Sequence, residues 1–397
     1  MTNGPLKVAW VSAFPVEWMP DAPEEARQLP KEHATSWMRV LAAELAPRRD
    51  VQLHAIALRK GIRRNFVFER RGVTFHVMRT LPMTRLPSLF WTDTWLIRSR
   101  LKQIQPRLVH AWGNERGAGL VASRLPYPYV VTIQGLLGWY RQMLKFGLQN
   151  NLTCRAEEIC LRRSRWATTE STFAKDFLRQ NYPALNVEQV EHAPDWLFHR
   201  TVREPQSSPI RVLTLGEVSY RKGTDLLLSA LDRLRGRLDF HLTVVGHPDD
   251  ELLATLRSQL SPELFQRVTF KHGLRPEEVG KEMAAATLMV LPTRADTSPN
   301  AVKEAAVMGL PVIGTSIGGI PDYVFPGKNG LLVPPGDVDA LAKALAEAAA
   351  HPQFSRGAVD PATLASVRDY LSPARMAENF LRVYRKVLET TPGAPGH

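Results

Sequence analysis

Short apolar runs alternate with longer amphipathic segments along the chain from residue 6 onward. Runs such as LKVAWVSAF (6–14) and VQLHAIAL (51–58) are rich in β-branched and aromatic residues, which predicts strands. Segments such as HATSWMRVLAAELA (33–46) repeat apolar residues at the helical period and predict helices. Strands that alternate with helices in this way predict a parallel sheet with helices on both faces.

The second half of the chain repeats this alternation. The runs IRVLTLG (210–216) and FHLTVVG (240–246) predict strands that end in glycine, at the edge where open α/β sheets bind ligands. The polar, proline-containing TVREPQSSP (201–209) is typical of a linker. The sequence therefore predicts an α/β protein with two Rossmann-like domains that face each other across a cleft, where a site is expected.

The composition is that of a soluble globular protein. The 397 residues exceed one ordinary core, and 44% are hydrophobic and 23% charged. No apolar run reaches the ~18 residues that cross a bilayer. KVAWVSAFP (7–15) fits a buried strand better than a signal peptide, because no small-residue cleavage site follows it. We therefore expect a cytoplasmic protein. Cys154 and Cys160 have the wrong spacing for a CxxC site, so we expect them to be packing residues.

The net charge of +12 comes entirely from the first half. Residues 1–200 carry 29 Lys+Arg against 17 Asp+Glu, and residues 201–397 carry 22 of each. LPSLFWTDTWLIRSRLKQ (86–103) and LLGWYRQMLKFGLQ (136–149) mix aromatic, aliphatic and cationic residues as interfacial helices do, which suits an anionic membrane surface and a lipid-linked acceptor. A solvated basic face over buried tryptophans explains the pattern equally well. No nucleic-acid motif accompanies the charge, so we expect no nucleic-acid partner.

The segment DTSPNAVKEAAVMGLP (296–311) predicts a helix with an exposed N-terminus. Ser298 suits the N-cap and Pro299 the first helical position, and Gly309 suits the end. The first amides, near Asn300 and Ala301, would then form an anion site suited to phosphate.

Two carboxylates flank this helix start. Asp296 precedes it, and Glu304 lies on the helix, where a carboxylate can accept two hydrogen bonds from the vicinal diol of a ribose. A capped helix with a surface glutamate explains this stretch alone equally well.

The segment GEVSYRKGTDLLLSAL (216–231) favours the anion site. Its predicted strand ends at Gly216, and Arg221 and Lys222 lie where the next helix begins. Cations there disfavour the helix dipole unless an anion binds nearby, although two solvated side chains are a common alternative. Together the two segments favour a nucleotide diphosphate that carries a polar group. His110 and His192 lie at predicted strand ends and are weaker candidates, since a lone histidine is more often structural.

Residues 210–345 closely resemble the large retaining GT-B family of glycosyltransferases, family 4 or group 1. GEVSYRKGTDLLLSAL, LTVVGHP, the stretch from VTFKHG to GGIPDYV, and GKNGLLVPPGDVDALAKAL follow the order of that family. The N-terminal half matches only in strand order. The resemblance implies a GT-B fold with an acceptor domain at 1–200, a nucleotide-sugar donor domain at 201–372, and a C-terminal helix at 373–397 that crosses back to the first domain.

The resemblance also implies roles for matched residues. Asp296 would contact hydroxyls of the donor sugar, Glu304 the ribose, and Lys222 the donor diphosphate. Glu217 stands where many members have an arginine, so Arg221 is the expected second cation and Arg294 the reserve. The residues so assigned are Asp296, Lys222 and Arg221 as catalytic, and Glu304, Gly216, Ser298, Asn300, Ala301 and Gln134 as donor-binding.

Two departures from the family pattern concern the donor. Asp296 replaces the more usual glutamate, which shortens the reach of the carboxylate toward the sugar. Gln134 replaces a histidine found in many members, which limits any role to hydrogen bonding.

The implied reaction moves a sugar from a nucleotide-diphosphate sugar to a hydroxyl of a carbohydrate or lipid-linked acceptor, with retention, in cell-surface polysaccharide or glycolipid assembly. No metal or other cofactor is expected, because cations and a helix N-terminus stabilise the leaving diphosphate. The enzyme would be cytoplasmic, or peripheral on the inner face of the membrane. The alternatives are an epimerase or a phosphorylase of the same fold, or a non-catalytic basic binding protein.

Overall fold

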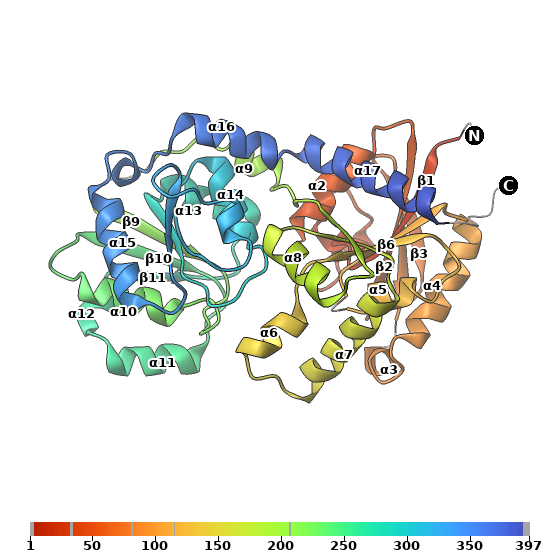
Figure 1. Cartoon of the computed structure of the whole chain (residues 1–397), viewed down its shortest axis with the longest axis horizontal. Helices are drawn as coiled ribbons and strands as arrows, with labels where there is room; N and C mark the ends of the chain where they lie inside the picture. The colour runs from red at the N-terminus through yellow and green to blue at the C-terminus, as the bar shows by residue number, and fades with distance from the viewer. Residues whose placement is uncertain (1–3, 32–34, 81, 115, 206–207, 392–397) are drawn as a thin grey trace. The chain divides into compact units, whose positions relative to one another are not determined.

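The computed structural model describes residues 4–31, 35–80, 82–114, 116–205 and 208–391 (Figure 1). The chain divides into two compact units, which we call the N-terminal unit (1–193 with 373–397) and the C-terminal unit (194–372). The boundary lies before residue 200 because α9 (Trp196–Arg200) packs against α14 (Asn300–Met308) of the C-terminal unit.

The N-terminal unit is built on an eight-stranded sheet in the order β3-β4-β2-β1-β5-β6-β7-β8. Neighbouring strands are parallel except for β3, which pairs antiparallel with β4 at the edge. The alternation in the sequence predicted the parallel part, and the antiparallel edge strand was not predicted. The strands are β1 (Leu6–Ser12), β2 (Val51–Arg59), β3 (Phe66–Arg70), β4 (Val73–Arg79), β5 (Leu108–Trp112), β6 (Tyr129–Ile133), β7 (Trp166–Thr169) and β8 (Asn186–Gln189).

The last helix of the chain closes the core of the N-terminal unit. Phe380 and Tyr384 on this helix, α17, are fully buried, and the Tyr384 hydroxyl accepts a hydrogen bond from Trp10 Nε1 at 3.2 Å. Figure 1 shows α17 beside α2, with which it packs. The helices are η1 (Val16–Trp18), α1 (Glu24–Arg27), α2 (Ser36–Leu45), α3 (Pro82–Arg85), α4 (Trp91–Ile104), α5 (Ala118–Ala122), α6 (Leu137–Met143), α7 (Leu148–Arg163), α8 (Thr172–Asn181) and α17 (Pro373–Thr390).

His110 packs within the core of the N-terminal unit. Its ring is fully buried, Nδ1 lies 2.8 Å from the Tyr384 hydroxyl and Nε2 lies 2.6 Å from Thr132 Oγ1. Burial lowers the pKa of His110 well below its ordinary value, since a charged imidazole loses hydration there. His110 therefore has a structural role.

The tryptophans of the N-terminal unit divide into two groups. Trp139, in the second of the two segments with interfacial composition, is buried and packs on Phe173 with 4.5 Å between ring centroids. Trp91 and Trp95, in the first segment, are 59% and 72% exposed on α4. Only the first segment presents its tryptophans to solvent.

The C-terminal unit has a six-stranded parallel sheet in the order β11-β10-β9-β12-β13-β14. Successive residues of its strands enter separate cores on the two faces: Leu288 and Val290 join one cluster, and Met289 and Leu291 join the other. The strands are β9 (Ile210–Leu215), β10 (Phe240–Val245), β11 (Val268–Lys271), β12 (Leu288–Leu291), β13 (Val312–Thr315) and β14 (Gly330–Val333). The remaining helices are α10 (Thr224–Arg233), α11 (Asp250–Gln259), α12 (Pro262–Phe265), α13 (Pro276–Ala285), η2 (Ile320–Asp322), α15 (Val338–Ala350), η3 (Phe354–Arg356) and α16 (Pro361–Tyr370).

Candidate functional site

The loops after β9 and β12 meet at the carboxyl edge of the C-terminal sheet. Gly223, at the start of α10, has a positive φ of 75°, and a Cβ there would lie 2.0 Å from the Pro292 carbonyl oxygen. Only glycine permits this approach of the two backbones. The approach brings the two cations before α10 to the loop that carries Asp296.

Lys222 and Asp296 form the centre of the site. Lys222 Nζ donates to Asp296 Oδ2 at 2.6 Å, and both side chains are largely buried. Arg221 lies beside them, with Nη1 donating to the Ala295 carbonyl at 3.0 Å and lying 3.8 Å from Asp296 Oδ2. The structure thus brings together the three residues that the sequence predicted as catalytic.

Two further contacts fix the loop that carries Asp296. The Ser298 amide donates to Asp296 Oδ1 at 3.2 Å. A Cβ on Gly318, in the loop after β13, would lie 1.7 Å from the Asp296 carbonyl oxygen, so this loop also approaches closely. Both oxygens of the Asp296 carboxylate accept hydrogen bonds from the protein, so its position is fixed before any ligand binds.

The start of α14 differs from the sequence prediction. Ser298 is not the N-cap: the helix begins at Asn300, Pro299 is the N-cap, and no described side chain caps it. The Ser298 hydroxyl instead lies 3.1 Å from the Tyr323 hydroxyl, which draws it away from the helix. Because Pro299 has no acceptor in its side chain, the amides of the first turn lack a capping partner, as an anion site requires. Gly309 ends the helix with φ 74°, as predicted.

Glu304 lies half-buried on α14, and within the described part of the chain its carboxylate makes no hydrogen bond or ion pair. Burial raises its pKa to about 7, with Asp195 raising it further and Lys303 opposing the shift. A hydrogen-bond donor from a bound ligand would stabilise the charged form of this half-buried carboxyl group.

The remaining predicted residues lie as follows. Arg294 donates to both oxygens of Asp225, at 2.8 and 2.7 Å, and its guanidinium carbon lies 3.7 Å from the Tyr220 ring centroid. These contacts tie Arg294, the expected reserve cation, to the scaffold of the C-terminal unit. Gly216 follows β9 with φ 129°, and a Cβ at this position would lie 3.5 Å from Lys222 Cε. Gln134 belongs to the N-terminal unit and lines a pocket there of about 350 Å³.

Among the described residues, no group of three or more His, Cys, Asp or Glu side chains is arranged to hold a metal ion. His192, the second histidine noted in the sequence, stacks on Trp37, and its Nδ1 lies 3.0 Å from Glu170 Oε1 in the N-terminal unit.

Two family models match the chain, one in each unit. The model described as Glycosyltransferase Family 4 matches residues 35–194, and the model described as Glycosyl transferases group 1 matches residues 209–351. The chain belongs to the family 4, group 1 glycosyltransferases. The resemblance seen in the C-terminal half is confirmed, and the match extends to the N-terminal half, where the sequence alone showed only strand order.

Individual relatives agree with the family. A 2-deoxystreptamine N-acetyl-D-glucosaminyltransferase of Streptomyces fradiae is 28% identical over an alignment of length 390, which covers 89% of this chain and 90% of that enzyme. A GDP-mannose-dependent alpha-(1-6)-phosphatidylinositol monomannoside mannosyltransferase of Mycolicibacterium smegmatis is 32% identical over an alignment of length 202, which covers 48% of this chain and 51% of that enzyme. The glycosyltransferase therefore spans about half the length of this second relative.

A solved structure shows the fold. Sucrose-phosphate synthase from Thermosynechococcus elongatus superposes with a TM-score of 0.79 at 18% identity, covering 97% of this chain and 100% of that one. The glycosyltransferase has the GT-B fold, as its sequence predicted.

Proposed function

We propose that this glycosyltransferase transfers a sugar from a nucleotide-diphosphate sugar to an acceptor hydroxyl with retention at the anomeric carbon. The observation that carries the proposal is the Lys222–Asp296 pair, 2.6 Å apart, in the loops beside the uncapped start of α14. A cation and a helix N-terminus at one place suit a leaving diphosphate, whose charge grows as the glycosidic bond breaks.

The proposed reaction gives each site residue a distinct role. Lys222, Arg221 and the amides of Asn300 and Ala301 would neutralise the diphosphate. Asp296 would accept hydrogen bonds from the donor sugar, and Glu304 from the ribose. The leaving phosphate oxygen would take the proton of the acceptor hydroxyl, so we assign no protein base.

Cell-surface polysaccharide or glycolipid assembly is the process we propose. The name of the Mycolicibacterium relative contains a glycolipid acceptor and a GDP-sugar donor. This supports a glycolipid acceptor and a nucleotide-sugar donor for the proposed reaction. Gln134 remains a proposed hydrogen-bond partner of the donor.

Release of nucleoside diphosphate from UDP-, GDP- and ADP-sugars, with octyl glycosides as acceptors, tests the activity. We expect that sugars of one nucleotide class release nucleoside diphosphate only when acceptor is present. The product should have the same anomeric configuration as the donor, as assigned by NMR. Conversion of the donor without acceptor would indicate an epimerase, and a requirement for inorganic phosphate a phosphorylase. Nucleic-acid binding without turnover, undiminished in Lys222 and Glu304 variants, would indicate a basic binding protein.

The role of Glu304 predicts a pH dependence of nucleotide binding. With its pKa raised to about 7, Glu304 is protonated below that pH and then accepts hydrogen bonds poorly. Affinity for the cognate nucleoside diphosphate should therefore rise as the pH increases from 6 to 8. Glu304→Gln should bind about 10–100-fold more weakly at pH 8, the range expected for hydrogen bonds to a charged group.

Titration calorimetry at several pH values checks this prediction. The matched control is Glu347→Gln, at an exposed position of α15, which should behave as the wild type. The phosphate of the ligand titrates in the same range, so the difference between wild type and Glu304→Gln is the relevant quantity. An equal pH dependence in both proteins would refute the ribose role.

We also propose that the reaction needs no metal ion, because Lys222, Arg221 and the start of α14 supply the positive charge. Activity after EDTA treatment and gel filtration should stay within about twofold of the untreated enzyme, since the protein groups alone then stabilise the leaving diphosphate. A loss of activity that Mg²⁺ or Mn²⁺ restores would contradict this proposal.

Peripheral membrane binding is proposed for the exposed face of α4. Trp91 and Trp95 line a hollow of about 870 Å³ together with Arg63, Arg64 and Arg79. Aromatic rings beside cations suit the boundary of an anionic bilayer. None of the helices within the described residues has an apolar stretch of the length that spans a bilayer.

Vesicle sedimentation tests this surface. The double variant Trp91→Ala/Trp95→Ala should bind phosphatidylserine-containing vesicles about tenfold more weakly, because it loses two interfacial rings. Phe325→Ala, at a 40% exposed position of the C-terminal unit, is the control and should bind normally. Equal binding by the double variant and the control would exclude this surface.

A further inference from the structure

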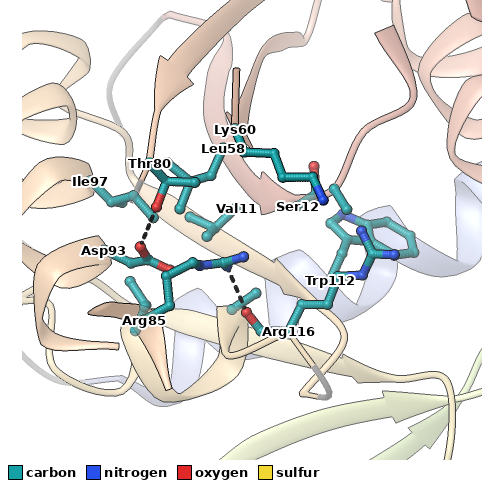
Figure 2. Close-up of a pocket in the computed structure, with 13 residues that line it drawn as sticks. Val11, Ser12, Leu58, Lys60, Thr80, Arg85, Asp93, Ile97, Trp112 and Arg116 are labelled. Atoms are coloured by element: carbon teal, nitrogen blue, oxygen red, sulfur yellow. Dashed lines mark hydrogen bonds and ion pairs between the residues drawn. The ribbon is translucent and has the colours of Figure 1, made fainter. Parts of the chain in front are cut away.

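A pocket of about 260 Å³ opens at the carboxyl edge of the N-terminal sheet (Figure 2). It lies where β1, β2, β4 and β5 end, and Ile97, Trp112 and Val121 give it an apolar wall. The volume lies just below the ~300 Å³ at which pockets for drug-sized molecules begin, so it suits a small polar group and not a whole oligosaccharide.

Cations dominate the polar lining of this pocket. Lys60 follows β2, Arg85 ends α3, and Arg116 follows β5, whereas Asp93 is the one described carboxylate that lines it. Lys60 is exposed and, among the described residues, makes no hydrogen bond or ion pair. Among the described residues that line the pocket, the cations thus outnumber the carboxylate, and a concave surface strengthens the field of such an excess charge.

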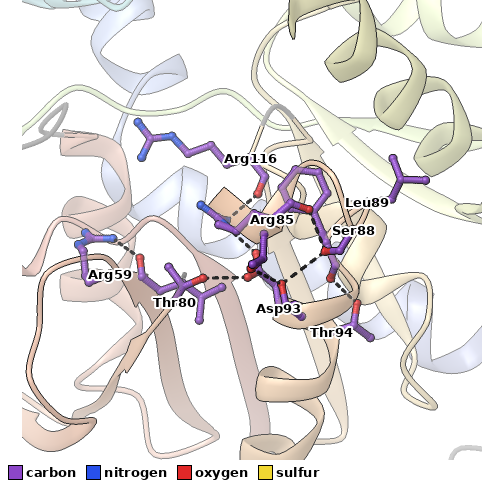
Figure 3. Close-up of polar contacts among 12 residues, drawn as sticks. Arg59, Thr80, Arg85, Ser88, Leu89, Asp93, Thr94 and Arg116 are labelled. Carbon is purple, nitrogen blue, oxygen red and sulfur yellow. Dashed lines mark hydrogen bonds and ion pairs between the residues drawn. The ribbon is translucent and has the colours of Figure 1, made fainter. Parts of the chain in front are cut away.

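Arg85 is held in place by hydrogen bonds to the buried Asp93 and to the Arg116 carbonyl (Figure 3). Its Nε donates to Asp93 Oδ2 at 2.7 Å, and its Nη2 donates to the Arg116 carbonyl at 3.1 Å. Asp93 is 1% exposed, and its Oδ1 accepts from Thr80 Oγ1 at 3.0 Å. The network therefore fixes the guanidinium plane and leaves Nη1 without a partner among the described residues.

We propose that this pocket binds a phosphate group carried by the acceptor. Lys60, Arg85 and Arg116 reach the pocket from three separate segments, which suits an anion with several oxygens that accept from different directions. A single arginine fork would satisfy a carboxylate, whereas phosphate offers further oxygens to the other two cations. Asp93 acts as a positioning residue for Arg85. This inference rests on the proposed function, since it specifies the acceptor of the same transfer reaction.

The phosphate belongs either to a soluble sugar phosphate or to a lipid headgroup, and paired probes distinguish these sources. Glucose 6-phosphate is compared with glucose, and monomeric dihexanoyl phosphatidic acid with dihexanoylglycerol. Titration calorimetry on the 397-residue chain without donor measures each affinity. We expect at least one phosphate probe to bind tenfold or more tightly than its neutral counterpart, and we expect added salt to weaken that binding.

Lys60→Gln is the decisive variant, because its exposed side chain supports no part of the fold. It should lose about tenfold in affinity for the phosphate probe and retain the affinity of the wild type for nucleoside diphosphates. Lys102→Gln, at an exposed position of α4 outside the pocket, is the matched control. Arg85→Lys, which keeps the charge but loses the fork, should also weaken phosphate binding.

Phosphate probes that bind no better than their neutral counterparts would overturn the inference, and so would equal binding by Lys60→Gln and wild type. The nucleotide titration separates this failure from failure of the proposed function. Nucleotide binding without phosphate preference would refute only the acceptor assignment. A preference for phosphate probes without nucleotide binding would support phosphate binding by this pocket and refute the proposed donor site.

Discussion

Turnover by a Lys222→Met variant is expected to fall about 10²–10³-fold, the loss typical when one group that stabilises developing negative charge is removed. Lys222 Nζ, 2.6 Å from Asp296 Oδ2, is the cation most firmly fixed at this site. Methionine keeps much of the length and apolar contact of the side chain, so the change acts mainly on charge. Steady-state kinetics with the cognate donor, at saturating acceptor, measures the effect.

Lys343→Met, at an exposed position of α15, controls for general loss of a lysine and should retain full activity. Thermal unfolding of the Lys222→Met variant separates a lost catalytic contribution from a lost fold. A well-folded Lys222→Met enzyme with turnover within threefold of the wild type would show that the diphosphate is stabilised elsewhere.

An Asp296→Ala variant should lose about 10²–10³-fold in kcat/KM, comparable to the loss of Lys222, because two functions depend on one carboxylate. Its Oδ2 accepts from Lys222, and its Oδ1 accepts from the Ser298 amide. Removal frees the lysine, loosens the loop and deletes the proposed contact with the donor sugar.

Asp296→Asn distinguishes charge from shape. The amide retains an acceptor for Ser298 but no negative charge for Lys222, so its loss should be smaller than that of Asp296→Ala. The Lys222→Met/Asp296→Asn double variant should fall less than the product of the single losses, because residues in direct contact are coupled. Strict additivity of the two losses would mean that the pair does not act as a unit.

Much of this fold follows from the hydrophobic pattern. Runs with strand composition end in glycine at Gly216 and Gly246, and both mark the sheet edge where the site lies. The same pattern predicts where loop residues meet, because parallel strands bring their carboxyl ends to one edge, whereas the roles of Asp296 and Lys222 are implied by the family resemblance. Asp296 and Lys222 are far apart in sequence yet meet there.

Other features depend on partners that the local sequence does not reveal. Ser298 has the chemistry of an N-cap, but the Tyr323 hydroxyl competes for it from another loop. Arg294 is as plausible a phosphate ligand as Arg221 until Asp225 is seen to bind both of its terminal nitrogens. Exposure of Trp95 and burial of Trp139 are likewise set by the packing around each helix.

The sequence pattern does not predict the cationic pocket of the N-terminal unit for a similar reason. Lys60 and Arg116 each follow a strand, which is a usable signal, but a basic stretch of this length holds many such residues. The hydrogen bonds from Arg85 and Thr80 to Asp93 distinguish the residues of this pocket from other basic residues. These bonds depend on how α4 packs on the sheet, which the local sequence does not reveal.

Calorimetric titration shows whether the C-terminal unit binds a nucleoside diphosphate through Lys222 and the start of α14. UDP, GDP and ADP are each compared with the corresponding nucleoside, on the wild type and on Lys222→Met. We expect that one diphosphate binds, that its nucleoside binds at least about tenfold more weakly, and that Lys222→Met loses most of this difference. Equal affinity for nucleoside and diphosphate, or a preference for diphosphate that survives in Lys222→Met, would contradict this binding mode.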